Sequence, residues 1–173
     1  MNRVIVNVQE NDSSYILSPK QIKALGGFVR KTLAELGRDK RDISVLLCGD
    51  KTITSLNSRY RGKNEATDIL SFAQDSGGFP NSTGKSRLNR DSRISGDIAV
   101  SLDTLRENAR RFKISDDEEL RRLLIHGILH LDGMDHKTNK NTEPMLRLQE
   151  EILSALEGYK ILPETGLSHG GES

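Results

Sequence analysis

The pattern of apolar and polar positions divides the chain into short strands and longer helices. RVIVNVQ (3–9) alternates with a period of two, which is typical of a strand. The stretch 18–37 has apolar residues every three to four positions, begins with Ser-Pro and ends with glycine, as an amphipathic helix does. By the same criteria we expect three more strands at 42–49, 67–73 and 96–102, and four more helices at 51–61 (capped by Asp50), at 103–113, from Ser115, and at 143–157.

The order of these segments indicates the fold class. Strands and helices alternate early, and helices dominate after residue 102, so we expect an α/β (α+β) fold with four strands and about five helices. The 173 residues are enough for one domain, assigned to 1–162, and too few for two comfortable ones. Residues 74–95 are rich in Gly, Ser and Asn and are expected to form a long loop, and 163–173, with a solvated His169, to form a disordered tail.

Composition narrows the classes of partner. The 26 basic and 25 acidic residues leave a net charge of only +1, so the chain as a whole does not point to a nucleic-acid partner and any basic surface must be local. The single cysteine, Cys48, lies in the apolar run ISVLLCG, and we expect it to be buried, with no disulfide-linked partner. No stretch approaches the roughly 18 apolar residues of a membrane span, and the N-terminus lacks an apolar leader. We therefore expect a cytoplasmic protein with no membrane partner.

The helix that starts at Ser115 carries the strongest chemical signal. Glu118 completes a capping box with Ser115, and Gly133 is expected to end the helix because glycine readily takes the left-handed conformation there. The apolar positions between these ends keep helical spacing at Leu120, Leu123, Leu124, Ile128 and Leu131.

Three histidines lie in the segment HGILHLDGMDH (126–136), which spans the end of this helix. His126 and His130 are four residues apart, so both imidazoles lie on one helix face and can reach one ion. The reversal at the glycine can bring His136 back to the same face. Three neutral nitrogen ligands with no fourth nearby are typical of a catalytic zinc site, and we expect one Zn²⁺ per chain. A structural zinc site is the alternative.

The histidine spacing matches the metzincin protease pattern except at Gly127, which replaces the glutamate general base. Without that carboxylate, three neutral ligands leave the ion its full charge, which favours an anionic substrate such as a phosphodiester. A glycine that only permits close helix packing is the alternative. Asp132 and Asp135 are candidates for accepting ring N–H groups of the histidines, and solvent-facing carboxylates are equally compatible.

The segment 126–136 closely resembles the signature of the YbeY-type endoribonucleases. LNSRYRGKNEATDILSF (56–72), SGDIAVS (95–101) and LRLQEEIL (146–153) resemble further segments of that family, so the likeness covers roughly 43–153. Two departures are NEAT (64–67), where the family commonly has Asp-x-Pro-Thr, and a longer 74–95 loop.

The resemblance implies a small mixed sheet, zinc held by the three histidines, and a cleft arginine at Arg61. From the residues alone, Arg61 ends a helix in the basic stretch RYRGK and could equally be a solvated charge; with the resemblance, we expect it to bind phosphate or stabilise the transition state. Asp97 is a candidate cleft or supporting residue, and a turn aspartate otherwise. Candidate RNA contacts are Lys63, Lys85, Arg87 and Arg90, of which the last three lie in a loop that could equally be merely solvated.

These observations predict a zinc-dependent endoribonuclease that cuts single-stranded RNA. The resemblance implies ribosomal RNA (16S rRNA) maturation and ribosome quality control, with the small ribosomal subunit as partner. Two alternatives are a non-catalytic ribosome-assembly factor with structural zinc and a metzincin-like metalloprotease. Aromatic residues are only 4% of the chain, so we expect little base stacking and weak sequence specificity.

Overall fold

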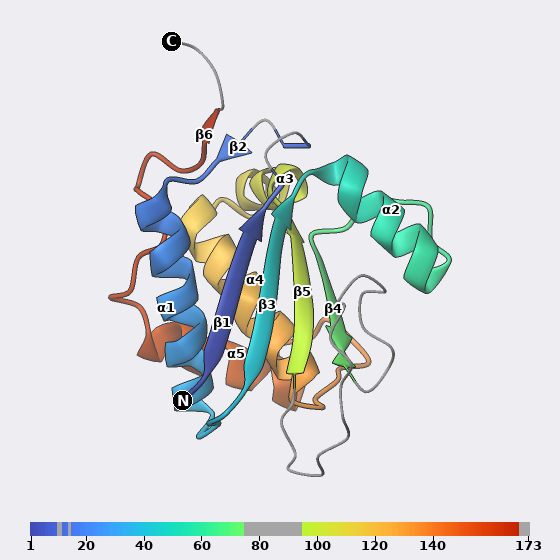
Figure 1. The fold of residues 1–173 in the computed structure, drawn as a ribbon. Helices are drawn as coiled ribbons and strands as arrows, with labels where there is room; N and C mark the ends of the chain where they lie inside the picture. The colour runs from blue at the N-terminus through green and yellow to red at the C-terminus, as the bar shows by residue number, and fades with distance from the viewer. Residues whose placement is uncertain (10–11, 14, 75–94, 170–173) are drawn as a thin grey trace.

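A four-stranded mixed sheet forms the centre of the molecule. We describe a computed structural model, in residues 1–9, 12–13, 15–74 and 95–169. The strands are β1 (Arg3–Val8), β3 (Asp42–Cys48), β5 (Ser95–Ser101) and β4 (Ile69–Ala73), in that spatial order. β1, β3 and β5 are parallel to one another, and β4 pairs antiparallel with β5 at the edge (Figure 1). The predicted mixed four-stranded sheet is confirmed.

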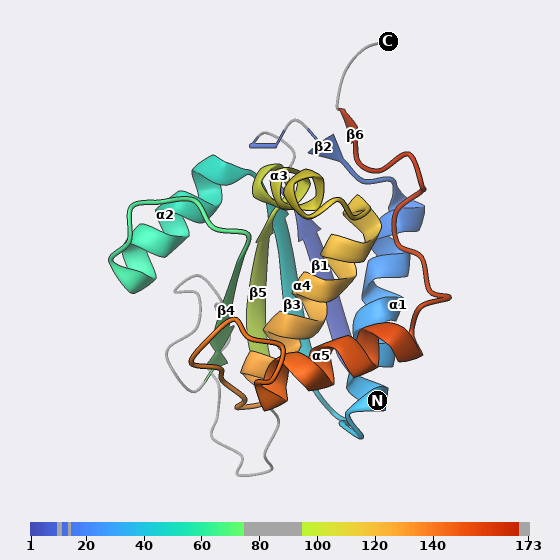
Figure 2. The same ribbon diagram turned by 180° about the vertical axis from the view of Figure 1, so that it is seen from behind.

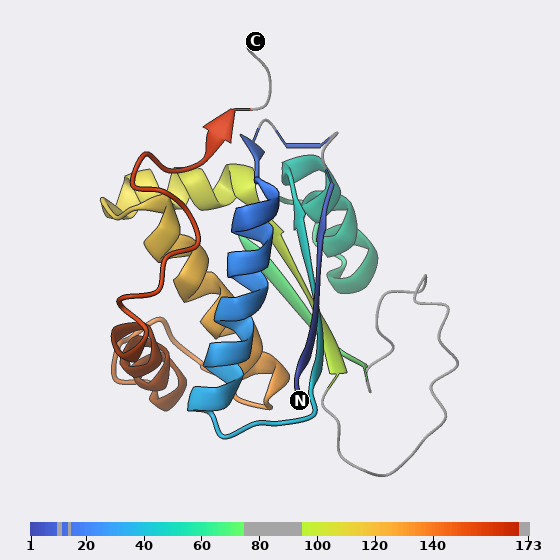
Figure 3. The ribbon, with the colours of Figure 1, turned by 60° about the vertical axis from the view of Figure 1, so that its left-hand side comes forward.

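Helices cover the two faces of the sheet unequally. Those described are α1 (Pro19–Glu35), α2 (Asp50–Arg61), α3 (Leu102–Phe112), α4 (Asp116–Leu131) and α5 (Pro144–Ala155), which confirms five helices. α1 and α4 lie on one face with α5 packed outside α4, as Figure 2 shows from behind. α2 lies on the opposite face (Figure 3).

The apolar core therefore has two parts. The larger cluster fills the space between the sheet and the α1 and α4 layer, with side chains such as Phe28, Val45 and Ile128 almost fully buried. The smaller cluster lies under α2 and contains Cys48, Ile53, Leu70 and Ala99. Burial raises the pKa of Cys48 to about 12, so this thiol stays protonated and unreactive. Within the described chain no helix has the length and apolar character needed to span a membrane.

Helix caps agree only in part with the predicted ones. At α1, Ser18 accepts a hydrogen bond from the Gln21 backbone and Gln21 caps the Ser18 backbone in return, a complete capping box. At α4, Ser115 accepts from the Glu118 backbone. The side chain of Glu118 turns instead to Arg122, so the predicted capping box there is only half formed.

The chain after residue 162 is not the disordered tail that its composition predicts, as far as residue 169. Leu167 is 5% exposed, and its backbone N–H donates to the Asp116 carboxylate. Strand β6 (Ser168–His169) pairs antiparallel with β2 (Tyr15–Ile16). Asp117 likewise accepts from two backbone N–H groups, at Ile161 and Leu162. Two buried carboxylates at the start of α4 thus hold a segment whose local sequence has no folding signal.

Candidate metal centre

The C-terminal end of α4 places the third histidine. Gly133 has φ of +92°, its N–H donates to the carbonyl of His130, and the N–H of Met134 donates to the carbonyl of Leu129. These two bonds form a Schellman motif, in which glycine meets no steric penalty for the left-handed conformation. The chain reverses there, as predicted from Gly133, and returns toward the helix face that carries His126 and His130.

Three imidazoles converge at this reversal. One ring nitrogen from each of His126, His130 and His136 lies within 4.8 Å of the other two. The Nε2 atoms of His126 and His130 are 3.1 Å apart. All three side chains are half-buried, so they are held in place but open to ligands on one side.

The hydrogen bonds behind the rings fix which nitrogen carries the proton. Nδ1 of His126 lies 2.8 Å from Gln149 Oε1, Nδ1 of His130 lies 3.0 Å from the Met134 carbonyl, and Nδ1 of His136 lies 3.0 Å from the Thr138 carbonyl. A carbonyl oxygen only accepts, so each Nδ1 donates and the Nε2 lone pairs point at one another. Convergent lone pairs with no proton between them repel, and a bound cation removes that repulsion. The donor set fits a divalent ion, and imidazole suits zinc.

The electrostatics of the site favour neutral, metal-binding imidazoles. Burial is the largest cause that lowers the pKa of His126 and of His130. The Gln149 hydrogen bond opposes this for His126, and the neighbouring His136 lowers the pKa of both rings further. Neutral rings near neutral pH keep their lone pairs available to a cation.

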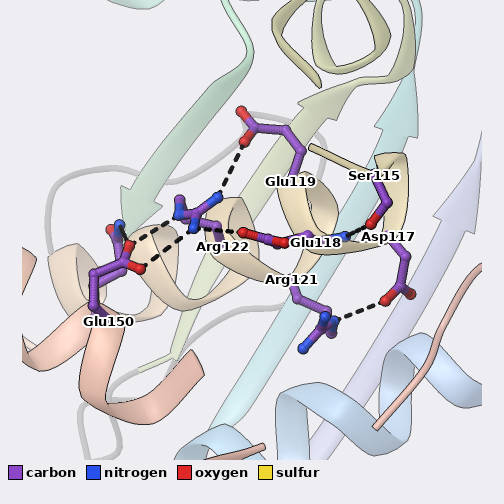
Figure 4. Close-up of polar contacts among 8 residues, drawn as sticks. Ser115, Asp117, Glu118, Glu119, Arg121, Arg122 and Glu150 are labelled. Carbon is purple, nitrogen blue, oxygen red and sulfur yellow. Dashed lines mark hydrogen bonds and ion pairs between the residues drawn. The ribbon is translucent and has the colours of Figure 1, made fainter. Parts of the chain in front are cut away.

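A cleft of about 720 Å³ adjoins the histidines. His126 and His136 line it together with residues from α3, α4, β4, α5 and the loop before α5. On its α4 side, Arg122 is bound by three carboxylates: Glu118 at 2.9 Å, Glu150 at 2.9 Å and Glu119 at 3.8 Å (Figure 4). Glu119 is 3% exposed, and burial raises its pKa to about 7. The guanidinium of Arg122 is thus fully engaged within the protein.

Comparison with known proteins identifies the family. The model of the family described as Endoribonuclease YbeY matches residues 7–157. The chain belongs to the YbeY family. It is 42% identical to Endoribonuclease YbeY of Treponema denticola over 134 residues, which are 78% of this chain and 83% of that protein. It is 38% identical to Endoribonuclease YbeY of Persephonella marina over 160 residues, 92% and 95% of the two chains. The solution structure of TM1509 from Thermotoga maritima matches with a TM-score of 0.58 and 26% identity, covering 90% of this chain and 89% of that one.

The arginine that the YbeY resemblance singles out lies at the edge of this centre. Arg61 is the last residue of α2, is exposed, and has its Cζ 6.0 Å from the ring of Phe72. Burial is the main cause that lowers the pKa of His130, and the charge of Arg61 adds to it, so the guanidinium is close enough to act on the imidazole. Lys63 is exposed in the turn that follows. The other candidate RNA contacts (Lys85, Arg87 and Arg90) and the predicted 74–95 loop, except Gln74 and Ser95, lie outside the described residues.

The three candidate supporting aspartates do not hold histidines in this YbeY chain. Asp132 binds Arg38 through two hydrogen bonds of 2.7 and 2.8 Å. Asp135 caps its neighbour's backbone N–H, and its carboxylate is 87% exposed and 3.9 Å from His130 Nδ1, too far for a hydrogen bond. Asp97 lies one residue before Ile98, whose side chain faces α4, so strand alternation places Asp97 on the α2 face. Gln149 and two backbone carbonyls take the supporting role instead.

Gly127 has a packing role that the metzincin comparison did not reveal. A Cβ atom added there would lie 2.9 Å from Cδ1 of Ile69 and 3.1 Å from Cδ1 of Ile98. The helix therefore lies so close to β4 and β5 that a larger side chain would force these isoleucine methyl groups to shift. The close-packing alternative explains this residue, and a side chain here would point at the sheet's apolar face.

Proposed function

We propose that the protein is a zinc-dependent endoribonuclease that cleaves single-stranded RNA. The observation that carries this proposal is the convergence of three Nε2 lone pairs beside an open cleft in a chain of the YbeY family. Zinc held by His126, His130 and His136 would supply Lewis-acid activation of water or of a phosphate oxygen. Membership of the YbeY family supports RNA as the substrate. We further propose that this RNA is ribosomal, that the small ribosomal subunit is the partner and that the cytoplasm is the compartment.

The protein's own residues would prepare the substrate and stabilise charge. The guanidinium of Arg61 would bind a phosphate oxygen on the open side of the histidines, where its two-pronged donors match the developing negative charge. The exposed Lys63 beside it would extend this contact to a neighbouring phosphate. Gln149 would keep the His126 ring in its ligand tautomer throughout.

The first alternative, a non-catalytic assembly factor, is distinguished by turnover. The second, a metalloprotease, lacks support because Gly127 faces the sheet and the position has no carboxylate to serve as base. Incubating the protein with RNA, matched DNA and a peptide, with and without a chelator, separates the three functions. The proposal expects chelator-sensitive cleavage of RNA alone. RNA left intact by zinc-loaded protein would contradict it.

Arg61 gives the sharpest test of a catalytic role. Arg61→Ala should retain zinc and fold but lower RNA cleavage by about 10²-fold or more, as for loss of one preorganised donor. Arg61→Lys should recover only part of the rate, because a point charge lacks the planar fork. The matched control is Arg59→Ala, which removes the same charge from an exposed position in the same helical turn and should cut at nearly the wild-type rate. Equal losses in the two alanine variants would contradict a specific role for Arg61.

A further inference from the structure

An exposed phenylalanine lines the cleft beside the histidines. Phe112, the last residue of α3, is 57% exposed. The other large apolar side chains exposed in the described chain are Met1, Ile5 and Ile16, so Phe112 is the aromatic one among them. It shares the lining of the 720 Å³ cleft with His126 and His136. A planar apolar ring is therefore presented to ligands in the same hollow as the metal centre.

The acidic and basic side chains that line the cleft nearly cancel one another. Its lining contains the carboxylates of Asp68, Glu119 and Glu150 against the guanidiniums of Arg111 and Arg122. Arg122 is already surrounded by carboxylates, as Figure 4 shows, and offers no unmatched positive charge. A polyanionic backbone finds no net positive charge on this side of the cleft. An uncharged planar group does not need one.

The remaining lining groups suit a flat polar heterocycle. Arg111 lies beside Phe112, with its Cζ 5.7 Å from the ring centroid, so cationic and aromatic surfaces adjoin. Asn139 and Asn141, exposed in the loop that follows His136, add amide donors and acceptors. The volume is within the range of sites that enclose a small molecule. Aromatic walls with amide edges are the means by which proteins hold unstacked bases of single-stranded RNA.

We propose that this cleft binds one nucleobase of the RNA, stacked on Phe112, next to the phosphate that is cut. The backbone then runs along the open side of the histidines toward Arg61 and Lys63, and the base on one side of the cut phosphate turns inward. This inference rests on the proposed function and adds a base subsite to it. It also explains a requirement for single strands, because a paired base cannot leave its stack without cost.

Binding of a short single-stranded RNA to metal-free protein tests the subsite without any cleavage. Phe112→Ala should weaken affinity about 5- to 150-fold, the range for losing one stacked base, and Phe112→Trp should preserve it. The matched control is Ile16→Ala, which shortens a 46% exposed apolar side chain in β2 and should bind as the wild type does. The salt dependence of binding should be the same for Phe112→Ala and wild type, because no phosphate contact is lost.

Substrate variants complete the test. In a series of RNAs that each lack the base at one position, one RNA should bind wild type as weakly as the intact RNA binds Phe112→Ala. For that RNA, Phe112→Ala should not weaken binding any further. Equal affinity of Phe112→Ala and wild type for every RNA would overturn the subsite. Phe112-dependent binding by a protein that never cuts RNA after zinc is restored would refute the proposed function and leave the subsite standing. Zinc-dependent cutting of RNA, with binding that does not depend on Phe112, would refute the subsite and leave the proposed function standing.

Discussion

Replacement of Gln149 by leucine tests whether an amide on α5 sets the affinity of the histidines for metal. Gln149 is 6% exposed, and its Oε1 accepts from His126 Nδ1 at 2.8 Å. Leucine has a similar volume but no acceptor, so the packing against α4 is largely kept and the hydrogen bond is lost. The ring is then able to move its proton to Nε2, the atom that faces the other two histidines.

The size of the effect follows from the contact that is removed. A buried N–H left without a partner costs about 1–3 kcal/mol. Loss of a group that orients a metal-binding histidine typically lowers metal affinity about 10- to 100-fold, which is about 1.4–2.7 kcal/mol. The two energy ranges overlap, because both describe the loss of the acceptor for the Nδ1–H group of His126, which is also present in the metal-bound state.

Zinc affinity is measured by competition with a chromophoric chelator at pH 7.5. Gln149→Leu should raise the Kd about 10- to 100-fold while one ion per chain still binds at saturation. Gln149→Glu keeps an acceptor and should bind at least as tightly as wild type. Glu151→Leu, an exposed position two residues along the same helix, is the control for changes in α5. A Kd for Gln149→Leu within twofold of wild type would refute the reasoning.

Substitutions at three further positions separate packing and charge from chemistry. Gly127→Glu forces a carboxylate against the sheet and should lower the free energy of unfolding, measured in urea, by several kcal/mol. Gly127→Ala should lower it by about 1–2 kcal/mol. Wild-type stability of the glutamate variant would contradict the packing role. Burial raises the pKa of Glu119 from 4.5 to about 7, so its contribution to stability is full below pH 4.5 and lost as the pH rises through 7. Relative to Glu119→Gln, wild type should lose on the order of 3 kcal/mol between pH 4.5 and 8, and parallel pH curves would argue against the raised pKa. Asp132→Asn should lower the free energy of unfolding by about 0.5–1 kcal/mol and leave zinc affinity unchanged. A tenfold loss of zinc affinity would show that Asp132 does support the histidines.

Helix α4, which carries His126 and His130, could be predicted from the sequence because its signals are local. The apolar period, the two histidines four residues apart and Gly133 all act within about two turns of α4. These signals lead to the Schellman motif at Gly133, and the chain reversal there brings His136 next to the other two histidines. The four main strands were also recognisable, since each is a short apolar run between polar segments.

The supporting contacts depend on long-range packing and left no such signal. Gln149 lies 23 residues from His126, and only the contact between α4 and α5 makes it a hydrogen-bond partner. The carboxylate of Asp132 accepts hydrogen bonds from Arg38, which is 94 residues away in the sequence. Residues 161–169 have no apolar period to mark them. They are held by the carboxylates of Asp116 and Asp117, which the sequence pattern alone would place on the surface.

The most direct test of the account is to titrate zinc into metal-stripped protein while following both bound metal and RNA cleavage. The account predicts that stripped protein is inactive, that cleavage rises in proportion to occupancy and reaches a plateau at one ion per chain, and that His136→Ala abolishes both binding and cleavage. Wild-type rates of RNA cleavage by the stripped protein, or by His136→Ala with no bound zinc, would contradict it.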